Sequence, residues 1–245
     1  MIVSVHIHKN GGMKFKNFLM KSYGQKLLLE YGKDNEILKR FFSGGNNPEP
    51  NIQNYENYDI VHGHFLANRF DSFPNIELIT FLREPAQRVI SNYYFFKRNF
   101  YAHSPICHMI KEGLSLEEYI DLDSSKNVQS FFFANKSIQD FKFIGILEEY
   151  ETSIFLMKKE LDIKFSLQNQ AYFYKEFLKY IKSNRKEGVM TFDKFNTNTN
   201  NDKDGSQYEI SSELEEHIKM NNQLDYKLYE EAKKCFDNLK EKYNV

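Results

Sequence analysis

Three clusters of residues in this 245-residue chain have the types and spacing that chemistry at an anion would need. In the first, Lys9 precedes the paired glycines Gly11 and Gly12, after an apolar run at Met1–Ile7 and ahead of a helical pattern. Glycines let backbone N–H groups approach an anion, and a helix N-terminus adds partial positive charge. The pattern predicts a phosphate-binding loop. It departs from the Walker spacing GxxxxGK[ST], because the lysine comes first and no Ser or Thr is placed to hold Mg²⁺. A tight turn with a solvated lysine is the alternative.

The second cluster consists of two histidines, His62 and His64, at the end of an expected strand, Tyr58–Val61. Because unperturbed imidazole titrates near neutral pH, the two are candidates for a general base and its helper. They could instead bind a metal, but no nearby Cys or third His completes a ligand set. An ordinary pair of loop histidines is the third possibility. The nearby anion loop favours the catalytic interpretation.

The third cluster follows the apolar run Ile76–Leu82. Arg83 stands at the end of this run, and Arg88 and Ser91 share a face of the helix expected after it. Arginine can contact a phosphate through two N–H groups and serine can donate a hydroxyl, so a second anion site is expected. The alternative is that Arg83 forms a structural ion pair with Glu84 or another acid.

The elements around these clusters predict an α/β fold. Short apolar runs rich in β-branched or aromatic residues predict buried strands at Met1–Ile7, Tyr58–Val61, Ile76–Leu82 and Phe141–Leu147. Helical patterns cover Arg88–Lys97 after Pro85, Glu148–Leu161, Ala171–Ser183 and Leu224–Tyr243. Ahead of the last of these, Ser211 or Ser212 can cap a further helix, and Glu215 is placed for a capping box on Ser212. Lys26–Tyr31 fits either a helix end or a further strand. We expect one domain, residues 1–245, in which helices flank a central, mostly parallel sheet; polar segments at about 41–56 and 196–208 are expected to be mobile loops.

Composition excludes several classes of protein. A formal net charge of −1 gives no overall field for nucleic acid, so any anion site must be local. Cys107 and Cys235 lack CxxC or metal-ligand spacing, which favours a reducing compartment. No apolar run approaches the roughly 20 residues of a membrane helix, and we expect no leader ahead of the first predicted strand. We therefore expect a cytoplasmic protein without a membrane span; its oligomeric state is not predicted.

The sequence resembles the PAPS-dependent carbohydrate O-sulfotransferases, in particular the heparan sulfate/uronyl 2-O-sulfotransferase branch. The family's 5′-phosphosulfate loop reads like IPKTGGTT, and residues 7–14 read IHKNGGMK. Its 3′-phosphate motif reads like LRDPxxRxxSxYY, and residues 82–94 read LREPAQRVISNYY. The sequence HGH at 62–64 is similar to the branch's catalytic histidine pair. Weaker likenesses cover 127–132, 143–149 and 221–229.

The resemblance implies a P-loop nucleotide kinase-like sulfotransferase fold, PAPS as sulfuryl donor, PAP as product and no metal. It implies His64 as base, with His62 and Lys9 as further catalytic residues. The implied cofactor contacts are Lys9, Asn10, Gly11, Gly12, Met13, Lys14, Arg83 and Ser91. Three family hydroxyl donors are replaced by Asn10, Met13 and Lys14; each lost hydrogen bond to a charged group costs about 1.5–3 kcal/mol.

The acceptor implied by the resemblance carries a hydroxyl, with a glycan or glycoconjugate as first choice and a small-molecule or lipid alcohol as the alternative. Two other functions stay open. A nucleotide kinase-like phosphotransferase shares the strand–loop–helix cradle but needs Mg²⁺ and typically an acid at a strand end. A nucleotide-binding relative that catalyses no transfer would fit the altered loop.

Overall fold

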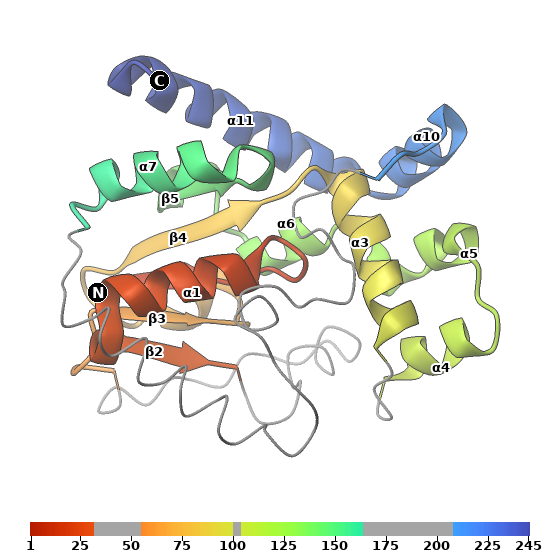
Figure 1. The fold of residues 1–245 in the computed structure, drawn as a ribbon, viewed down its shortest axis with the longest axis horizontal. Coiled ribbons are helices and arrows are strands. Elements are labelled where there is room, and N and C mark those ends of the chain that lie inside the picture. Colours follow the sequence, from red (N-terminus) through yellow and green to blue (C-terminus); the bar gives the residue numbers. More distant parts are fainter. Residues whose placement is uncertain (32–54, 100–103, 164–207) are drawn as a thin grey trace, which may run out of the picture.

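A five-stranded parallel sheet forms the centre of the protein (Figure 1). The structure is a computed structural model that describes residues 1–31, 55–99, 104–163 and 208–245. The strands are β1 (Ile2–Val5), β2 (Leu27–Glu30), β3 (Ile60–Gly63), β4 (Glu77–Leu82) and β5 (Phe141–Ile146), in the order β2-β3-β1-β4-β5. All four strand pairings are parallel. The predicted α/β architecture is confirmed.

The strands differ from the predicted ranges in two informative places. The ambiguous segment Lys26–Tyr31 contains β2, the edge strand, which pairs with β3. β3 begins two residues later than predicted and includes His62, because the parallel register sets Ser4 of β1 opposite this histidine and Val5 opposite Gly63. Gly63 is required there, since a Cβ would lie 1.9 Å from the carbonyl oxygen of Glu30 on β2.

Helices surround the sheet, and several of them lie beyond the carboxyl ends of the strands (Figure 1). The α-helices are α1 (Gly12–Tyr23), α3 (Pro85–Arg98), α4 (Pro105–Lys111), α5 (Leu116–Asp121), α6 (Val128–Phe133), α7 (Tyr150–Glu160), α10 (Ser212–Asn221) and α11 (Gln223–Tyr243). Short 3₁₀ turns are η1 (Gly24–Lys26), η3 (Ala67–Phe70), η4 (Asp123–Ser125), η5 (Ile138–Asp140) and η6 (Leu147–Glu149). Helices α7 and α11 pack against β5, whereas α3 contacts α4, α5 and α10.

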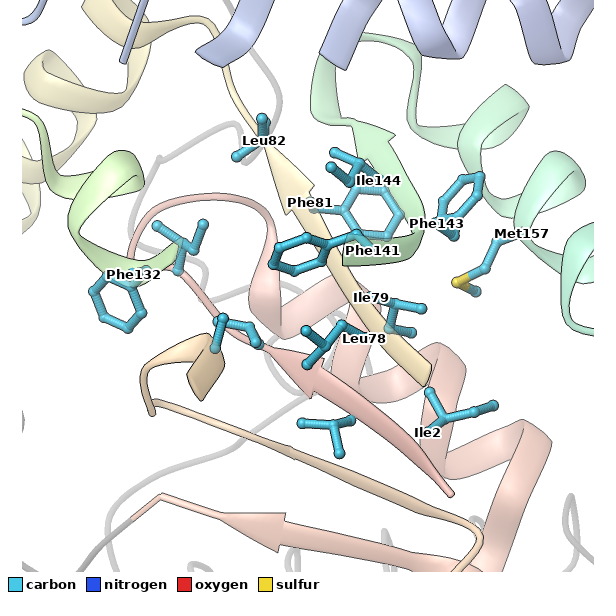
Figure 2. Packing of buried hydrophobic residues seen from close by; sticks show 14 of the residues in the cluster. Ile2, Leu78, Ile79, Phe81, Leu82, Phe132, Phe141, Phe143, Ile144 and Met157 are labelled. Atoms are coloured by element: carbon cyan, nitrogen blue, oxygen red, sulfur yellow. The ribbon is translucent and has the colours of Figure 1, made fainter. Parts of the chain in front are cut away.

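Two hydrophobic cores hold these layers together. The larger one fills the space around the sheet, where Phe81, Phe143 and Met157 lie near one another (Figure 2). The second lies between α3 and its neighbouring helices and includes Ile90 and Tyr119. The sheet and α3 therefore belong to adjacent packed units, and the segment between β4 and α3 crosses from one to the other.

The ends of several helices follow directly from the sequence. Pro85 is the first residue of α3, and the Glu84 side chain accepts hydrogen bonds from the first-turn N–H groups of that helix. Ser211 caps α10 by accepting from the Leu214 N–H. The predicted capping box between Ser212 and Glu215 is wrong, because the helix begins one residue before that box requires.

The remaining predicted elements are met in part. The expected helix at 148–161 is divided into η6 and α7. The predicted final helix is present as α11, which packs against β5 and buries Ala232 and Phe236 in the larger core. The predicted helix Ala171–Ser183 and most of the two predicted mobile loops lie outside the described residues. At the ends of those loops, Tyr55 and Tyr208 are held by hydrogen bonds to Glu30 and Gln87.

Candidate functional site

The three clusters meet at the carboxyl edge of the sheet because β1, β3 and β4 are neighbours. The loop after β1 lies between His64, which follows β3, and Arg83, which follows β4. The His64 Nδ1 atom is 2.8 Å from the His6 carbonyl oxygen, and Nη1 of Arg83 donates to the Lys9 carbonyl at 3.2 Å. Strands β2 and β3 lie on one side of β1, and β4 and β5 lie on the other. The strand order therefore reverses at β1, which is the position at which open α/β sheets bind ligands.

The backbone of the loop has the alternating hand of an anion-binding nest. Lys9 and Gly11 have positive φ angles of 68° and 75°, Asn10 between them does not, and α1 begins at Gly12. Such alternation turns N–H groups of a loop toward one point, although here the Asn10 N–H donates to the Ile7 carbonyl at 3.3 Å. Gly11 is the N-cap of α1 and has no side chain to bond the first turn. The N–H groups in the first turn of α1 therefore have no side-chain cap, and they lie at the end of the helix where an anion is favoured.

Asn10 fixes this loop to the sheet through its side chain. It is buried, and its amide nitrogen donates to the Phe81 carbonyl at 2.7 Å and to Oε1 of Gln129 at 2.8 Å. The amide nitrogen of Asn10 is thus used within the fold. The family resemblance places Asn10 among the cofactor contacts, and that role stays a prediction. Gln129 of α6 was missed: it also accepts from the Arg83 N–H and donates to the Arg83 carbonyl.

The two loop lysines also have partners. Nζ of Lys9 lies 4.4 Å from the centre of the Phe95 ring on α3. Lys14 forms an exposed ion pair with Glu151, at 2.8 Å, and lies over the Tyr150 ring of α7. Met13 is half-buried on the first turn of α1. Lys9 is therefore directed toward the helix that carries Ser91, and Lys14 toward the opposite side.

The residues of the predicted second anion site are Ser91 on α3 and Arg83, two residues before that helix. Arg83 and Ser91 are each only 3% exposed. Within the described part of the chain, the Ser91 hydroxyl makes no hydrogen bond. Arg88 has a structural role: it is fully buried and donates to the Ser125 carbonyl at 2.7 Å. Burial lowers the pKa of Arg88, and the nearby charge of Asp225 opposes that shift.

Two of the segments with a weaker family likeness, 127–132 and 221–229, contact each other through Asp225. It is buried on α11 and accepts from the N–H groups of Gln129 and Ser130 at the start of α6. Asn222 accepts from the Asn127 N–H at 2.9 Å. A carboxylate at a helix N-terminus is stabilising. The C-terminal helix therefore holds α6, whose Gln129 in turn holds Asn10 and Arg83.

The least expected feature is a stack of four imidazole rings. His64 lies between His8, with ring centres 3.9 Å apart, and His6, at 4.2 Å. His6 also stacks on His62 at 5.1 Å. The Tyr31 hydroxyl is 3.0 Å from Nδ1 of His6. His6 and His8 were not singled out from the sequence, although HxH occurs at the ends of two strands that pair in parallel.

The stack is held in its neutral form. Burial lowers the pKa of His64 to about 4, opposed by its bond to the His6 backbone. Burial, and then the charge that His64 would carry, lower the pKa of His62 to about 3. The pKa values of His6 and His8 are well below the usual range for the same main reason, burial. Because a carbonyl only accepts, Nδ1 of His64 carries the proton and Nε2 keeps its lone pair, which is the tautomer a general base needs.

The histidine stack also corrects the statement that no third histidine lies near the HGH pair. The rings nevertheless face one another, and in the described ranges no group of three or more His, Cys, Asp or Glu residues is placed to hold a metal ion. Over the same ranges, no helix is long and apolar enough to cross a membrane.

Comparisons with known proteins find similarity among solved structures. No protein-family model and no curated protein matches the sequence. Among solved structures, the chain is similar to mouse sulfotransferase SULT7A1 complexed with PAP. The identity is 11%, the TM-score is 0.45, and the match covers 97% of this chain and 87% of that one.

Proposed function

We propose that this protein transfers a sulfuryl group from PAPS to an acceptor hydroxyl. The observation that carries the proposal is the meeting of three motifs at one sheet edge: the nest before α1, the HGH pair and the Arg83–Ser91 pair. Each was singled out from the sequence, and each lies at the carboxyl end of a different strand. An anion cradle, a second anion site and a neutral imidazole are the groups that such a transfer uses.

The described residues fit such a donor. The α1 N-terminus and the nest at Lys9–Gly11 would hold the 5′-phosphosulfate, with the charge of Lys9 close by. Arg83 and the Ser91 hydroxyl, which makes no hydrogen bond within the described ranges, would hold the 3′-phosphate. The bond from Arg83 to the Lys9 carbonyl couples the two ends of this site. When bound, PAPS supplies the activated sulfuryl group and a phosphate as leaving group.

His64 is the proposed general base. Its Nε2 lone pair would take the proton of the acceptor hydroxyl as the oxygen attacks sulfur, while Lys9 and the cradle N–H groups stabilise charge on the departing phosphate. His62, whose Nδ1 lies 2.8 Å from the Ser4 hydroxyl inside the sheet, would act by supporting the stack. No step in this scheme calls on a metal.

The acceptor and the location extend the proposal beyond the geometry. A sugar hydroxyl on a glycan or glycoconjugate is our first choice, supported by the HGH likeness to glycan-modifying enzymes. A small-molecule or lipid alcohol is the alternative. The two cysteines, one of them buried on α4, suit a reducing cytoplasmic setting.

The test is an acceptor screen with PAPS, read by mass spectrometry as the gain of a sulfuryl group and the release of PAP. His64→Asn is the matched variant, because the Asn amide can still donate to the His6 carbonyl but offers no base. We expect turnover in the natural protein and loss of at least about 100-fold in kcat in His64→Asn. Full turnover in the variant would remove His64 from the base role. PAP binding without transfer to any acceptor would favour a non-catalytic relative, and Mg²⁺-dependent ATP turnover would favour phosphoryl transfer.

A further inference from the structure

The rings on either side of His64 are suited to hold it in one orientation. His8 and His6 lie against its two faces with interplanar angles of 29° and 23°. The hydrogen bond from Nδ1 and the covalent bond to Cβ hold His64 at two points, which still leaves the ring able to tilt about the line between them. Contact on both faces fixes the plane, and with it the direction of the Nε2 lone pair.

Each flanking ring is held in place by contacts with residues other than His64. The His6 ring meets the Tyr31 hydroxyl and occupies the space where a Cβ of Gly12 would lie. The His8 ring lies edge-on against Phe132 of α6, with centres 5.5 Å apart and planes at 81°. The sandwich therefore links β2, α1 and α6 to a single imidazole.

His8 contributes its ring face more than its nitrogen atoms. Its Nε2 is buried and has no hydrogen-bond partner within the part of the chain that the structure describes. The charged side chains that act on His8 are Arg88 and Lys9, and both oppose its protonation. Another neutral aromatic ring at position 8 should therefore preserve the stacking on His64.

We propose that His6 and His8 are positioning residues for His64: their stacked rings hold its imidazole so that Nε2 faces the acceptor. This inference rests on the proposed function for its catalytic meaning, although the orientation and tautomer of His64 are measurable without any substrate.

The experiment compares His8→Phe with His8→Ala by ¹⁵N–¹H correlation spectra of the histidine side chains and by steady-state kinetics. We expect one His64 tautomer, protonated on Nδ1, in the natural protein and in His8→Phe. His8→Ala should show mixed or shifted His64 signals, a kcat lowered about tenfold or more and a KM for PAPS within about twofold. His217→Ala, at a half-buried histidine of α10 that bonds Asp121 outside the stack, is the control and should remove only its own signals.

Equal kcat and unchanged His64 signals in His8→Ala would overturn the proposal. A His8→Phe variant as impaired as His8→Ala would also overturn it, because the nitrogens would then matter more than the face. If His8→Ala fails to fold, His8→Leu supplies bulk without an aromatic plane and is compared in the same way. If the natural protein transfers sulfuryl to no acceptor, the proposed function fails, while the spectra still decide whether the rings position His64.

Discussion

Replacing Gly12 by alanine should destabilise the protein through one contact, that with the His6 ring. An ideal Cβ on Gly12 would lie 1.6 Å from Nε2 and 1.9 Å from Cε1 of His6, so the ring must move. Movement would break the bond to Tyr31, about 1 kcal/mol, and overpacking adds about 1–3 kcal/mol. We expect Gly12→Ala to lower the free energy of unfolding by about 2–4 kcal/mol.

A double-mutant cycle isolates this contact. Urea unfolding is measured for the natural protein, Gly12→Ala, His6→Ala and the double variant. Without the imidazole, alanine at position 12 should be neutral or stabilising by up to about 1 kcal/mol, because Gly12 opens α1 and alanine is the better helix former. The coupling energy should thus reach about 2 kcal/mol or more. An equal cost of Gly12→Ala in both backgrounds, within about 0.5 kcal/mol, would refute the reasoning.

Three further outcomes are expected. Because burial lowers the folded-state pKa of His64 to about 4, the unfolded chain binds a proton that the native state does not; stability is full above about pH 6.5 and falls by about 3 kcal/mol toward pH 4 for this residue alone. Denaturant titrations across this range should show the fall, and a flat profile would contradict it. Asp225→Asn removes a charge near buried Arg88 and should lower the free energy of unfolding by about 3 kcal/mol, measured by thermal unfolding. An unchanged free energy of unfolding would contradict this prediction. Lys14→Ala breaks an exposed ion pair with Glu151 and should alter stability by no more than about 0.5 kcal/mol while weakening PAP binding less than about tenfold; a larger loss in calorimetry would show a direct contact.

The sequence alone was enough for the parallel sheet and for the placement of the three clusters. Apolar runs of four to seven residues that alternate with helical patterns identify strands of this kind, and the carboxyl ends of adjacent parallel strands must share one edge. The edge strand β2 stayed ambiguous because its short run Leu27–Glu30 follows the first helix with only a 3₁₀ turn between them.

The histidine stack and the role of Asn10 could not be predicted in the same way. The four rings come together only through the register of β1 against β3, which sets Ser4 opposite His62. The signal was present as two HxH sequences, but which residue faces which depends on register. Asn10 is a predicted cofactor contact because residues 7–14 resemble the family's loop, and its bond to Gln129 could not be foreseen because that residue lies 119 positions along the chain.

The most direct test of the central claim is calorimetric titration of the natural protein and Ser91→Ala with PAP and with adenosine 5′-monophosphate, which lacks the 3′-phosphate. The Ser91 hydroxyl makes no hydrogen bond within the described ranges, so its removal should leave the fold intact. We expect PAP to bind the natural protein more tightly than the monophosphate, and Ser91→Ala to weaken PAP about tenfold or more without affecting the monophosphate, as loss of one hydrogen bond to a charged group requires. Equal affinity for the two nucleotides, or binding of Mg²⁺-ATP without PAP, would contradict the assignment of a PAPS site.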